Sequence, residues 1–466
     1  MKRPQPIDAA REFRIDEMFF STTDRKGVIL SGNDVFVRVS GYARHELVGK
    51  PHNIIRHPEM PRAVFRLIWS RLLAASPVAG LVKNLAADGR HYSVIALLLP
   101  VGDGFLSVRF KPSSELTPRV AALYRRMRAC EEAARDGGAD GPASMDAAEK
   151  LLADELRAQG FESYDAFMRK LLHEELKSRD ATLAREKLRL FPAEAISRNG
   201  GEIAIIDRAA RRAYREINTL YAQLDEFASL NERLAERSAF VLGLTQEFRF
   251  IAFNAALRSA RVGVEGSGLA VIADYLGASL ENTSNLVGAF TERTRSVSTG
   301  LSAVIFDLAA ARLQIEMVIG FCGELLCREA KAGADADGCR RMIGQLQAGF
   351  AGTIARAAAA LLAIERELGR LGENSEELRR LVLALQVAQV GGLVEARRLK
   401  EDDSFEVMFG DLRVGIERTK TALADLDQAR ERLRGLADQT PAIQAEIGLA
   451  VREIDAVVMR LAVPAD

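Results

Sequence analysis

The sequence predicts an α+β domain with a five-stranded antiparallel sheet, followed by an all-α long helical bundle of coiled-coil hairpins. Nine of the 13 prolines lie at or before Pro118 and none lies between 193 and 440, so long helices can run there. The first 116 residues carry 17 basic and 11 acidic side chains, although the whole chain has 64 of each. These asymmetries place a domain boundary near residue 116.

The order of elements in the first part predicts the sheet. Residues 17–30 are expected to form two strands around a turn at Asp24–Gly27, and residues 33–48 two short helices. A proline-bounded loop, 51–61, precedes a helix that starts after Pro61. Three strands follow, with a hairpin turn at Asp88–Gly89. About 100 residues suffice for one such domain.

Six runs in this region carry a family resemblance: STTDRKGVI, GNDVFVRVSGY, ELVGKPHNIIRHPEMP, FRLIW, VKNLAADGRHY and SVRFKP. In order and spacing they resemble the PAS domain of bacterial aerotaxis receptors over residues 15–116. That family holds FAD non-covalently and reads its redox state as a proxy for oxygen and respiratory energy. The resemblance implies that the residues at the family's flavin-associated positions contact the cofactor here: Asn33, Arg56, His57, Trp69 and Asn84.

These residue types suit a flavin. Trp69, the sole tryptophan, offers an aromatic wall, the two asparagines offer amide donors and acceptors, and Arg56 and His57 offer charge-assisted contacts. These residues also have structural interpretations that need no ligand, with Trp69 as a residue of the hydrophobic core and His57 as a residue that orders the loop. Haem bound through His57 or His91 is the alternative cofactor. The run departs from the family at Glu59, which stands in place of aspartate, and at Ser93, which stands in place of an aromatic residue.

Several classes of site are not predicted. The cysteines, Cys130, Cys322, Cys327 and Cys339, form no C-x-x-C pair and accompany no histidine cluster, so we expect no metal site. The longest charge-free run counted in the helical part is 381–394, shorter than the roughly 20 residues of a membrane span. The N-terminus has no apolar signal region, so a cytoplasmic location is expected. Balanced charge argues against nucleic-acid binding.

The helical part begins with a connector, 117–202, which is broken by glycine-rich segments. From residue 203 apolar side chains recur at spacings of four and three over five heptads, the pattern of a coiled coil or long bundle helix. The pattern returns after a glycine-containing segment, so residues 203–330 are predicted to form a helical hairpin with its tip near 256–268.

The tip resembles the signalling tip of methyl-accepting chemotaxis proteins, which docks the chemotaxis kinase and its coupling protein. The resemblance implies a role for six residues: Asn254, Arg258, Arg261, Gly263, Gly266 and Gly268. Arg258 and Val264 stand where the family has glutamates, and these departures argue against kinase coupling. Other receptor-like proteins are the remaining class of partner.

An internal comparison extends the helical prediction. Residues 393–419 align without gaps to residues 257–283 at an offset of 136, with six identities in 27 positions. The C-terminal region, 331–466, is therefore expected to be helical, with a second, degenerate hairpin as the hypothesis. Helices 203–258, 268–330, 337–394 and 404–462 would then form a four-helix bundle within one chain.

Together these patterns predict a cytoplasmic signal-transduction sensor. A flavin in the PAS domain would sense redox state, oxygen or energy, and the helical bundle would relay the signal. No nucleophile–base pair, carboxylate pair or metal cluster predicts an enzyme. Two alternatives stay open: a scaffold protein with a degenerate receptor tip, and a small-molecule binder that uses the PAS pocket directly.

Overall fold

A computed structural model describes the backbone of residues 4–188, 190, 201–329, 336–399, 403–437 and 440–462. Within these ranges, the side chains of some helical residues, chiefly 224–235, 280–285 and 326–341, are not described. By its internal contacts the chain divides into two compact units. Unit 1 comprises 1–221, 305–357 and 442–466, and unit 2 comprises 222–304 and 358–441.

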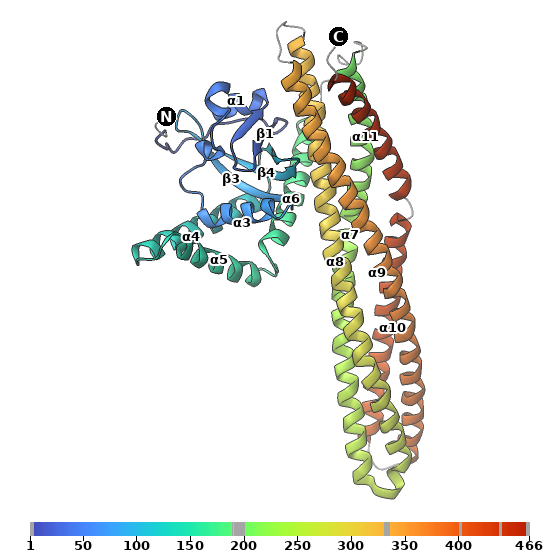
Figure 1. The fold of residues 1–466 in the computed structure, drawn as a ribbon. Helices are drawn as coiled ribbons and strands as arrows, with labels where there is room; N and C mark the ends of the chain where they lie inside the picture. The colour runs from blue at the N-terminus through green and yellow to red at the C-terminus, as the bar shows by residue number, and fades with distance from the viewer. Residues whose placement is uncertain are drawn as a thin grey trace. The chain divides into compact units, whose positions relative to one another are not determined.

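The N-terminal domain is built around an antiparallel sheet, which has five strands in the described part of the chain (Figure 1). Their order is β2-β1-β5-β4-β3, and every pairing is antiparallel. The elements are β1 Met18–Asp24, β2 Ile29–Gly32, α1 Asp34–Ser40, α2 Arg44–Leu47, the 3-10 helix η1 His52–Ile55, α3 Arg62–Leu73, β3 Val78–Leu85, β4 His91–Val101 and β5 Gly104–Phe110. The predicted fold class is confirmed.

Tight turns fix the register of the strands. Asp24 accepts hydrogen bonds from the backbone N–H groups of Lys26 and Val28, both at 2.8 Å, and Gly27 takes a φ of 78°. Gly89 takes a φ of 86° at the turn between β3 and β4. Glycine adopts this left-handed conformation without the clash that a Cβ would cause.

Three helices leave the sheet: α4 Leu116–Asp136, α5 Gly141–Ala158 and α6 Tyr164–Arg185. Two fully buried carboxylates tie them to the domain. Glu131 of α4 accepts hydrogen bonds from the first backbone N–H groups of α3, Arg62 N at 3.0 Å and Ala63 N at 2.7 Å. Glu175 of α6 accepts hydrogen bonds from the chain that links β5 to α4, including Ser113 N at 2.6 Å. Each satisfies donors that otherwise lack partners.

A buried ion network joins α6 to the long helix α8, Ser267–Glu329, within unit 1. Arg179 donates to Glu316 at 2.6 Å, and these side chains are 0% and 1% exposed. Arg312 bonds the other oxygen of Glu316 at 3.0 Å and also pairs with Asp180. Burial alone raises the pKa of Glu316, but the two arginines reverse that effect and hold it below its ordinary value. The carboxylate is therefore charged and compensated.

The other long helices are α7 Glu202–Val262, α9 Ala336–Leu399, α10 Asp403–Ala437 and α11 Thr440–Ala462, with a 3-10 turn, η2, at Gly263–Gly266 (Figure 1). The hypothesised helix over 404–462 corresponds to α10 and α11, and residues 438–439 between them lie outside the described residues. The heptad positions Ala213, Ile217, Leu220, Phe248 and Ala252 are buried, while those over 224–245 have no described side chains.

Unit 2 contains parts of α7, α8, α9 and α10, which contact one another. A Cβ on Gly268 of α8 would lie 2.9 Å from Glu395 of α9, and one on Gly415 of α10 would overlap the ring of Phe248 of α7. The tip at 263–266 and the end of α9 at Leu399 differ by 136 positions, as in the sequence repeat. Three pairs of residues at this offset have both members buried: Leu269 and Phe405, Ala273 and Phe409, Leu276 and Leu412.

Among the described residues one helix, Met342–Arg398, is long and apolar enough to cross a membrane by length and composition alone. No membrane span was expected from the sequence, because the runs without a charged residue are shorter than a span. Between 342 and 364 Arg356 is the only charged residue, and it pairs with Asp307 of α8 at 3.1 Å. Core helices of soluble bundles share this composition, so the finding is weak evidence for a membrane span.

Candidate functional site

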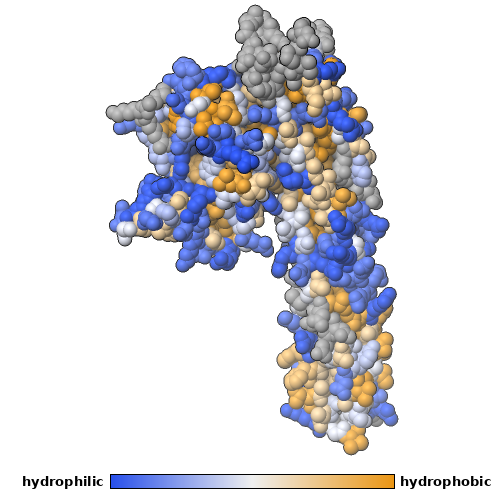
Figure 2. Space-filling model, in the orientation of Figure 1, coloured by the Kyte–Doolittle hydropathy of each residue, from blue (hydrophilic) through white to orange (hydrophobic). Residues whose placement is uncertain are grey.

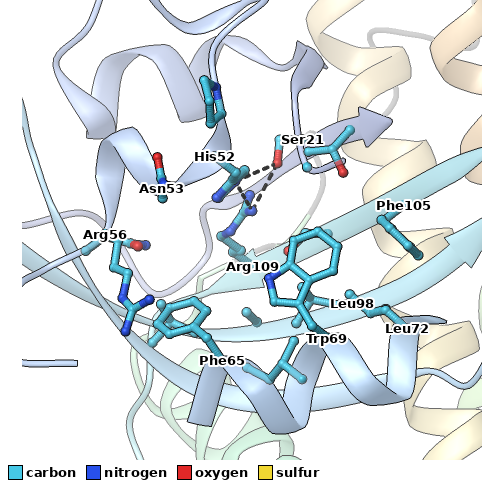
Figure 3. A pocket seen from close by; sticks show the side chains of 18 of the residues that line it. Ser21, His52, Asn53, Arg56, Phe65, Trp69, Leu72, Leu98, Phe105 and Arg109 are labelled. Atoms are coloured by element: carbon cyan, nitrogen blue, oxygen red, sulfur yellow. Dashed lines mark hydrogen bonds between the residues drawn. The ribbon is translucent and has the colours of Figure 1, made fainter. Parts of the chain in front are cut away.

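The N-terminal domain encloses a cavity of about 370 Å³ between one face of the sheet, the helix α3 and the segment 51–53 (Figure 3). We call it the inner cavity. Its volume lies within the range of small-molecule sites. The lining residues are Ser21, Thr23, Lys26, Gly27, Pro51, His52, Asn53, Arg56, Phe65, Ile68, Trp69, Leu72, Val82, Asn84, Ala96, Leu98, Phe105, Ser107 and Arg109.

The alternation of side chains along β5 explains the cavity. Phe105, Ser107 and Arg109 line it, whereas the intervening residues face the opposite side of the sheet. Small side chains at Ser107 and at Ala96 of β4 leave space that larger residues would fill. On the opposite face, Phe20 of β1 packs edge-on against Phe321 of α8 with ring centroids 5.3 Å apart. The sheet therefore separates the cavity from the long helix α8.

Aromatic side chains from α3 form one wall. Trp69 lies edge-to-face with Phe105, with ring centroids 5.5 Å apart, and Figure 3 shows its indole directed into the cavity. Phe65 lies one turn earlier on the same helix, and the guanidinium of Arg56 sits 4.0 Å above its ring. Because α3 begins at the backbone groups held by Glu131, the wall is positioned by a side chain from α4.

Arg109 is the dominant charge in the inner cavity. Its side chain donates to Ser21 Oγ at 3.0 Å and to His52 Nε2 at 2.7 Å (Figure 3). The described residues place no carboxylate within ion-pair distance of it. Burial lowers the pKa of Arg109 to about 10, so the group stays cationic at neutral pH. Burial, and secondly the charge of Arg109, lower the pKa of His52 to about 3, so the imidazole is neutral and accepts this bond.

Three polar atoms of lining residues are buried and have no hydrogen-bond partner in the described part of the chain. They are Asn84 Nδ2, Ser107 Oγ and Arg109 Nη1. Leaving a buried donor unsatisfied costs about 1–3 kcal/mol. Such clusters therefore indicate a site where a ligand completes the hydrogen bonding.

A second hollow, of about 590 Å³, adjoins the inner cavity and shares Pro51, Asn53 and Arg56 with it. We call it the basic groove. Its lining includes five cationic side chains and, among the described residues, no carboxylate: Lys50, Arg56, Arg62, Arg128 and Arg135, with His57, Pro4, Tyr42, Pro51, Asn53, Ile54, Pro58 and Met60.

The structure distributes the predicted site residues over three places. Trp69 and Asn84 line the inner cavity, Arg56 lines both hollows, and His57 lines the basic groove. His57 is 2% exposed, and its Nδ1 accepts a hydrogen bond from Glu59 N at 3.3 Å. Asn33 lines neither hollow. It caps α1 by accepting from Phe36 N.

Asn33 also reaches beyond its own domain. Its Nδ2 donates to Glu324 of α8 at 2.8 Å, and Asp34 N donates to the other oxygen of the same carboxylate at 3.3 Å. Both partners belong to unit 1. The residue that the resemblance associates with flavin therefore lies at a contact between the sheet domain and a long helix.

The sequence patterns did not single out Arg109, Ser21, His52 or Phe65 as site residues. A signal for Arg109 was present, because an arginine in the middle of an apolar strand, GFLSVRF, is rarely buried without a purpose. His52 and Ser21 carry no such signal, since their proximity to Arg109 depends on strand pairing and on the path of η1.

At the hairpin tip, Gly263 takes a φ of 73° and Ser259 Oγ donates to Gly266 O at 3.2 Å, which closes the turn. Gly268 permits the approach of Glu395 rather than reversing the chain. Arg258 and Arg261 are exposed and Asn254 is half-buried. Val264 is 91% exposed, and four other apolar side chains of unit 2 are also exposed: Phe250, Phe253, Val271 and Tyr275. Figure 2 shows hydrophobic residues on the surface at the lower end of the long helices.

Comparison with known proteins gives the relatives of these regions. The chain is 40% identical over 119 residues to the aerotaxis receptor of Escherichia coli K12, a match that covers 24% of each protein. It is 24% identical over 378 residues to the biofilm dispersion protein BdlA of Pseudomonas aeruginosa, covering 65% of this chain and 90% of that one. The chain is a PAS domain joined to a chemotaxis-receptor-like helical region. No family model matches the chain.

The PAS domain has further relatives of more distant kind. The nitrogen fixation regulatory protein of Klebsiella pneumoniae is 31% identical over 81 residues, which cover 17% of this chain and 16% of that one. Among solved structures, the PAS domain of a Colwellia psychrerythraea protein matches 20% of this chain and 85% of that chain, with 21% identity and a TM-score of 0.18. The aerotaxis-receptor match spans about a quarter of that receptor's length.

Proposed function

We propose that the PAS domain binds a flavin in the inner cavity and that the chain is a cytoplasmic, non-catalytic redox or oxygen sensor that feeds a chemotaxis-type signalling bundle. The observation that carries this proposal is the set of three unsatisfied buried polar atoms on Asn84, Ser107 and Arg109. A flavin ring offers carbonyl and ring-nitrogen acceptors to donors and an apolar face to Trp69. The aerotaxis-receptor relative supports the same choice.

Different residues of the inner cavity would contact different parts of such a ring. Trp69 and Phe65 would pack against it, and Asn84 Nδ2 and Arg109 Nη1 would donate to its polar edge. A bound flavin supplies electron-transfer chemistry that responds to oxidants. Arg109, with its neutral neighbour His52, favours negative charge at that edge, because no carboxylate among the described residues offsets the guanidinium.

Haem is less well supported. Of the two candidate ligands, His57 lines the basic groove and His91 lines neither hollow, whereas the histidine that lines the inner cavity, His52, uses its Nε2 to accept a hydrogen bond from Arg109. A haem ligand needs an imidazole nitrogen directed at the iron.

A change in the cavity has two routes to the bundle. The sheet itself carries the cavity on one face and Phe20, in contact with Phe321, on the other. The second route runs through Asn33, which links the cap of α1 to Glu324 of α8. In either case the ligand state would bias one packing of α8 over another rather than yield a chemical product.

The visible absorption spectrum of the purified full-length protein tests the cofactor proposal. Twin flavin bands are expected, and Trp69→Ala and Asn84→Ala should lower the flavin content. Leu73→Ala, at a position of α3 that is 68% exposed and lines neither hollow, is the control and should leave the flavin content unchanged. A Soret band would replace flavin by haem. A colourless protein that takes up neither FAD, FMN nor riboflavin would refute the sensor proposal.

A scaffold role is the second candidate function, favoured by the exposed Arg258 and Val264 at the tip. Both replace the carboxylates that the receptor resemblance leads one to expect. A pull-down with a chemotaxis coupling protein separates the two functions. Capture that is lost in Asn254→Ala or Arg261→Ala variants supports signalling, whereas the absence of capture supports the scaffold.

A further inference from the structure

We propose that α3 is a movable wall of the inner cavity, and that carboxylates on α4, α5 and α6 hold this wall closed and so control entry into the cavity. We call these carboxylates the acidic clamp: Glu131, Asp146, Glu149 and Asp165. The inference goes beyond the proposed function, because it concerns access to the cavity whatever ligand occupies it.

The inner side of α3 borders the cavity instead of a filled core. Phe65, Ile68, Trp69 and Leu72 all line the hollow of about 370 Å³. The indole of Trp69 reaches the turn between β1 and β2, where a Cβ on Gly27 would lie 2.9 Å from it. Side chains that border a void lose the contacts that fix residues in a close-packed interior. Much of what holds α3 in place must therefore act on its outer side.

The acidic clamp supplies these outer contacts. The buried carboxylate of α4 described above accepts hydrogen bonds from the first N–H groups of α3. Arg66, in the middle of α3, donates to Asp146 and Glu149 of α5, both at 2.7 Å. Arg71, in the last turn of α3, pairs with Asp165 of α6 at 2.5 Å. The clamp thus holds the wall at its start, its middle and its end.

The ion pairs of the clamp are weak enough to open. The side chains of Arg66, Arg71 and Asp146 are 32%, 48% and 70% exposed. Ion pairs in contact with water contribute little to stability, and salt screens them. One such pair shifts the equilibrium between a closed and an open wall by a factor of about two to five, which biases the wall without locking it.

The backbone after α3 supports a movement of the helix. Ala75 takes a φ of 56°, in the left-handed region that residues with a Cβ rarely adopt. Strained residues of this kind are found in ligand clamps and in segments that switch between conformations. The start of α3 is held by a buried carboxylate, whereas its later turns are held by exposed ion pairs. The helix can therefore swing about its start, with Ala75 taking up the change in backbone angle.

Cysteine labelling measures this opening directly. Ser107 lines the cavity, is 6% exposed, and its hydroxyl has no hydrogen-bond partner among the described residues, so Ser107→Cys places a thiol behind the wall with little disturbance. Full-length protein, after removal of any bound flavin, is treated with N-ethylmaleimide, and peptide mass spectrometry gives the labelling rate at this position. Asp146→Asn and Glu149→Gln should each raise that rate about two- to fivefold. Asp154→Asn, whose partner Arg157 lies on α5 itself, is the matched control and should leave the rate unchanged.

Salt gives a second readout of the clamp. Raising the NaCl concentration from about 0.05 M to about 1 M should speed the labelling of the Ser107→Cys protein, because salt screens the exposed ion pairs. The same change should have a smaller effect when Asp146→Asn and Glu149→Gln are also present, since fewer ion pairs remain to be screened.

Native cysteines separate opening of the wall from general unfolding. Cys322 is fully buried in α8, so its labelling rate in the same sample should stay unchanged. A parallel rise at Cys322, or clamp variants that leave the rate at Ser107→Cys unchanged, would overturn the inference. Labelling at Ser107→Cys as fast as at the half-exposed Cys130 would show that the cavity is open without any movement of α3, and would overturn it as well. The absorption spectrum tests the proposed function separately, so either proposal can fail while the other stands.

Discussion

The ion network behind the sheet gives a sharp prediction for Glu316→Gln. This substitution keeps the shape of the side chain and removes the charge between Arg179 and Arg312. Arg312 retains Asp180, with bonds of 2.7 and 2.5 Å, but Arg179 is 0% exposed and loses its only carboxylate partner in the described part of the chain. An uncompensated buried charge costs about 3–5 kcal/mol.

The expected loss is measurable as a fall in melting temperature. At about 2–4 °C per kcal/mol for a unit of a few hundred residues, the midpoint should fall by roughly 10 °C. Circular dichroism at 222 nm follows the helices, and urea titration gives the free energy of unfolding directly. Glu186→Gln, a change at an exposed carboxylate at the end of α6, is the matched control and should shift neither.

A double-mutant cycle then isolates the pair. Replacing both partners by apolar residues, Arg179→Met with Glu316→Leu, removes the charges together and should restore most of the stability, since well-packed apolar pairs match buried ion pairs. A loss below about 1 kcal/mol in Glu316→Gln, or additive effects in the cycle, would show that the network does not hold α6 to α8.

Three further predictions follow from burial and packing. The pKa of His52 is lowered to about 3 in the folded protein, so below pH 6.5 its imidazole takes up a proton only in the unfolded chain. The free energy of unfolding should therefore fall by about 2 kcal/mol at most as the pH drops from 6.5 to 5. Urea titrations of His52→Gln should show a smaller dependence on pH. Burial raises the pKa of the Cys322 thiol, so in the native protein a thiol reagent should label the half-exposed Cys130 at least tenfold faster than Cys322. Equal labelling rates would contradict the burial of Cys322. Gly410→Ala should stabilise the protein by about 0.5–1 kcal/mol, because a Cβ at this position meets nothing within 4 Å. Gly415→Ala should destabilise it, because a phenylalanine ring occupies the space of the Cβ. Thermal scans that rank the two variants in the opposite order would refute this helix packing.

Local patterns predicted the sheet well because its signals are local. The turns at Asp24–Gly27 and Asp88–Gly89 and the alternation along the strands determine the pairing, and the proline distribution separates the two parts of the chain.

The site was predicted less completely because its chemistry depends on long-range contacts. Trp69 and Asn84 were found through the resemblance, and both line the inner cavity. Arg109 acquires its role from Ser21 and His52, which lie 88 and 57 positions away in the chain. These three residues are too far apart in the chain to form a recognisable sequence motif. The basic groove likewise forms only when α4 packs against the start of α3.

Two buried carboxylates tie α4 and α6 to the sheet. They determine which fragment of the chain is expected to fold on its own. The sequence boundary at residue 116 would separate the PAS sheet from Glu131 and Glu175, leaving the start of α3 and the β5–α4 link with bare N–H groups. A fragment that ends there should be aggregation-prone, while one that extends through α6 keeps both carboxylates. A chimera that joins this PAS domain to a different C-terminal region would therefore need to include α4, α5 and α6.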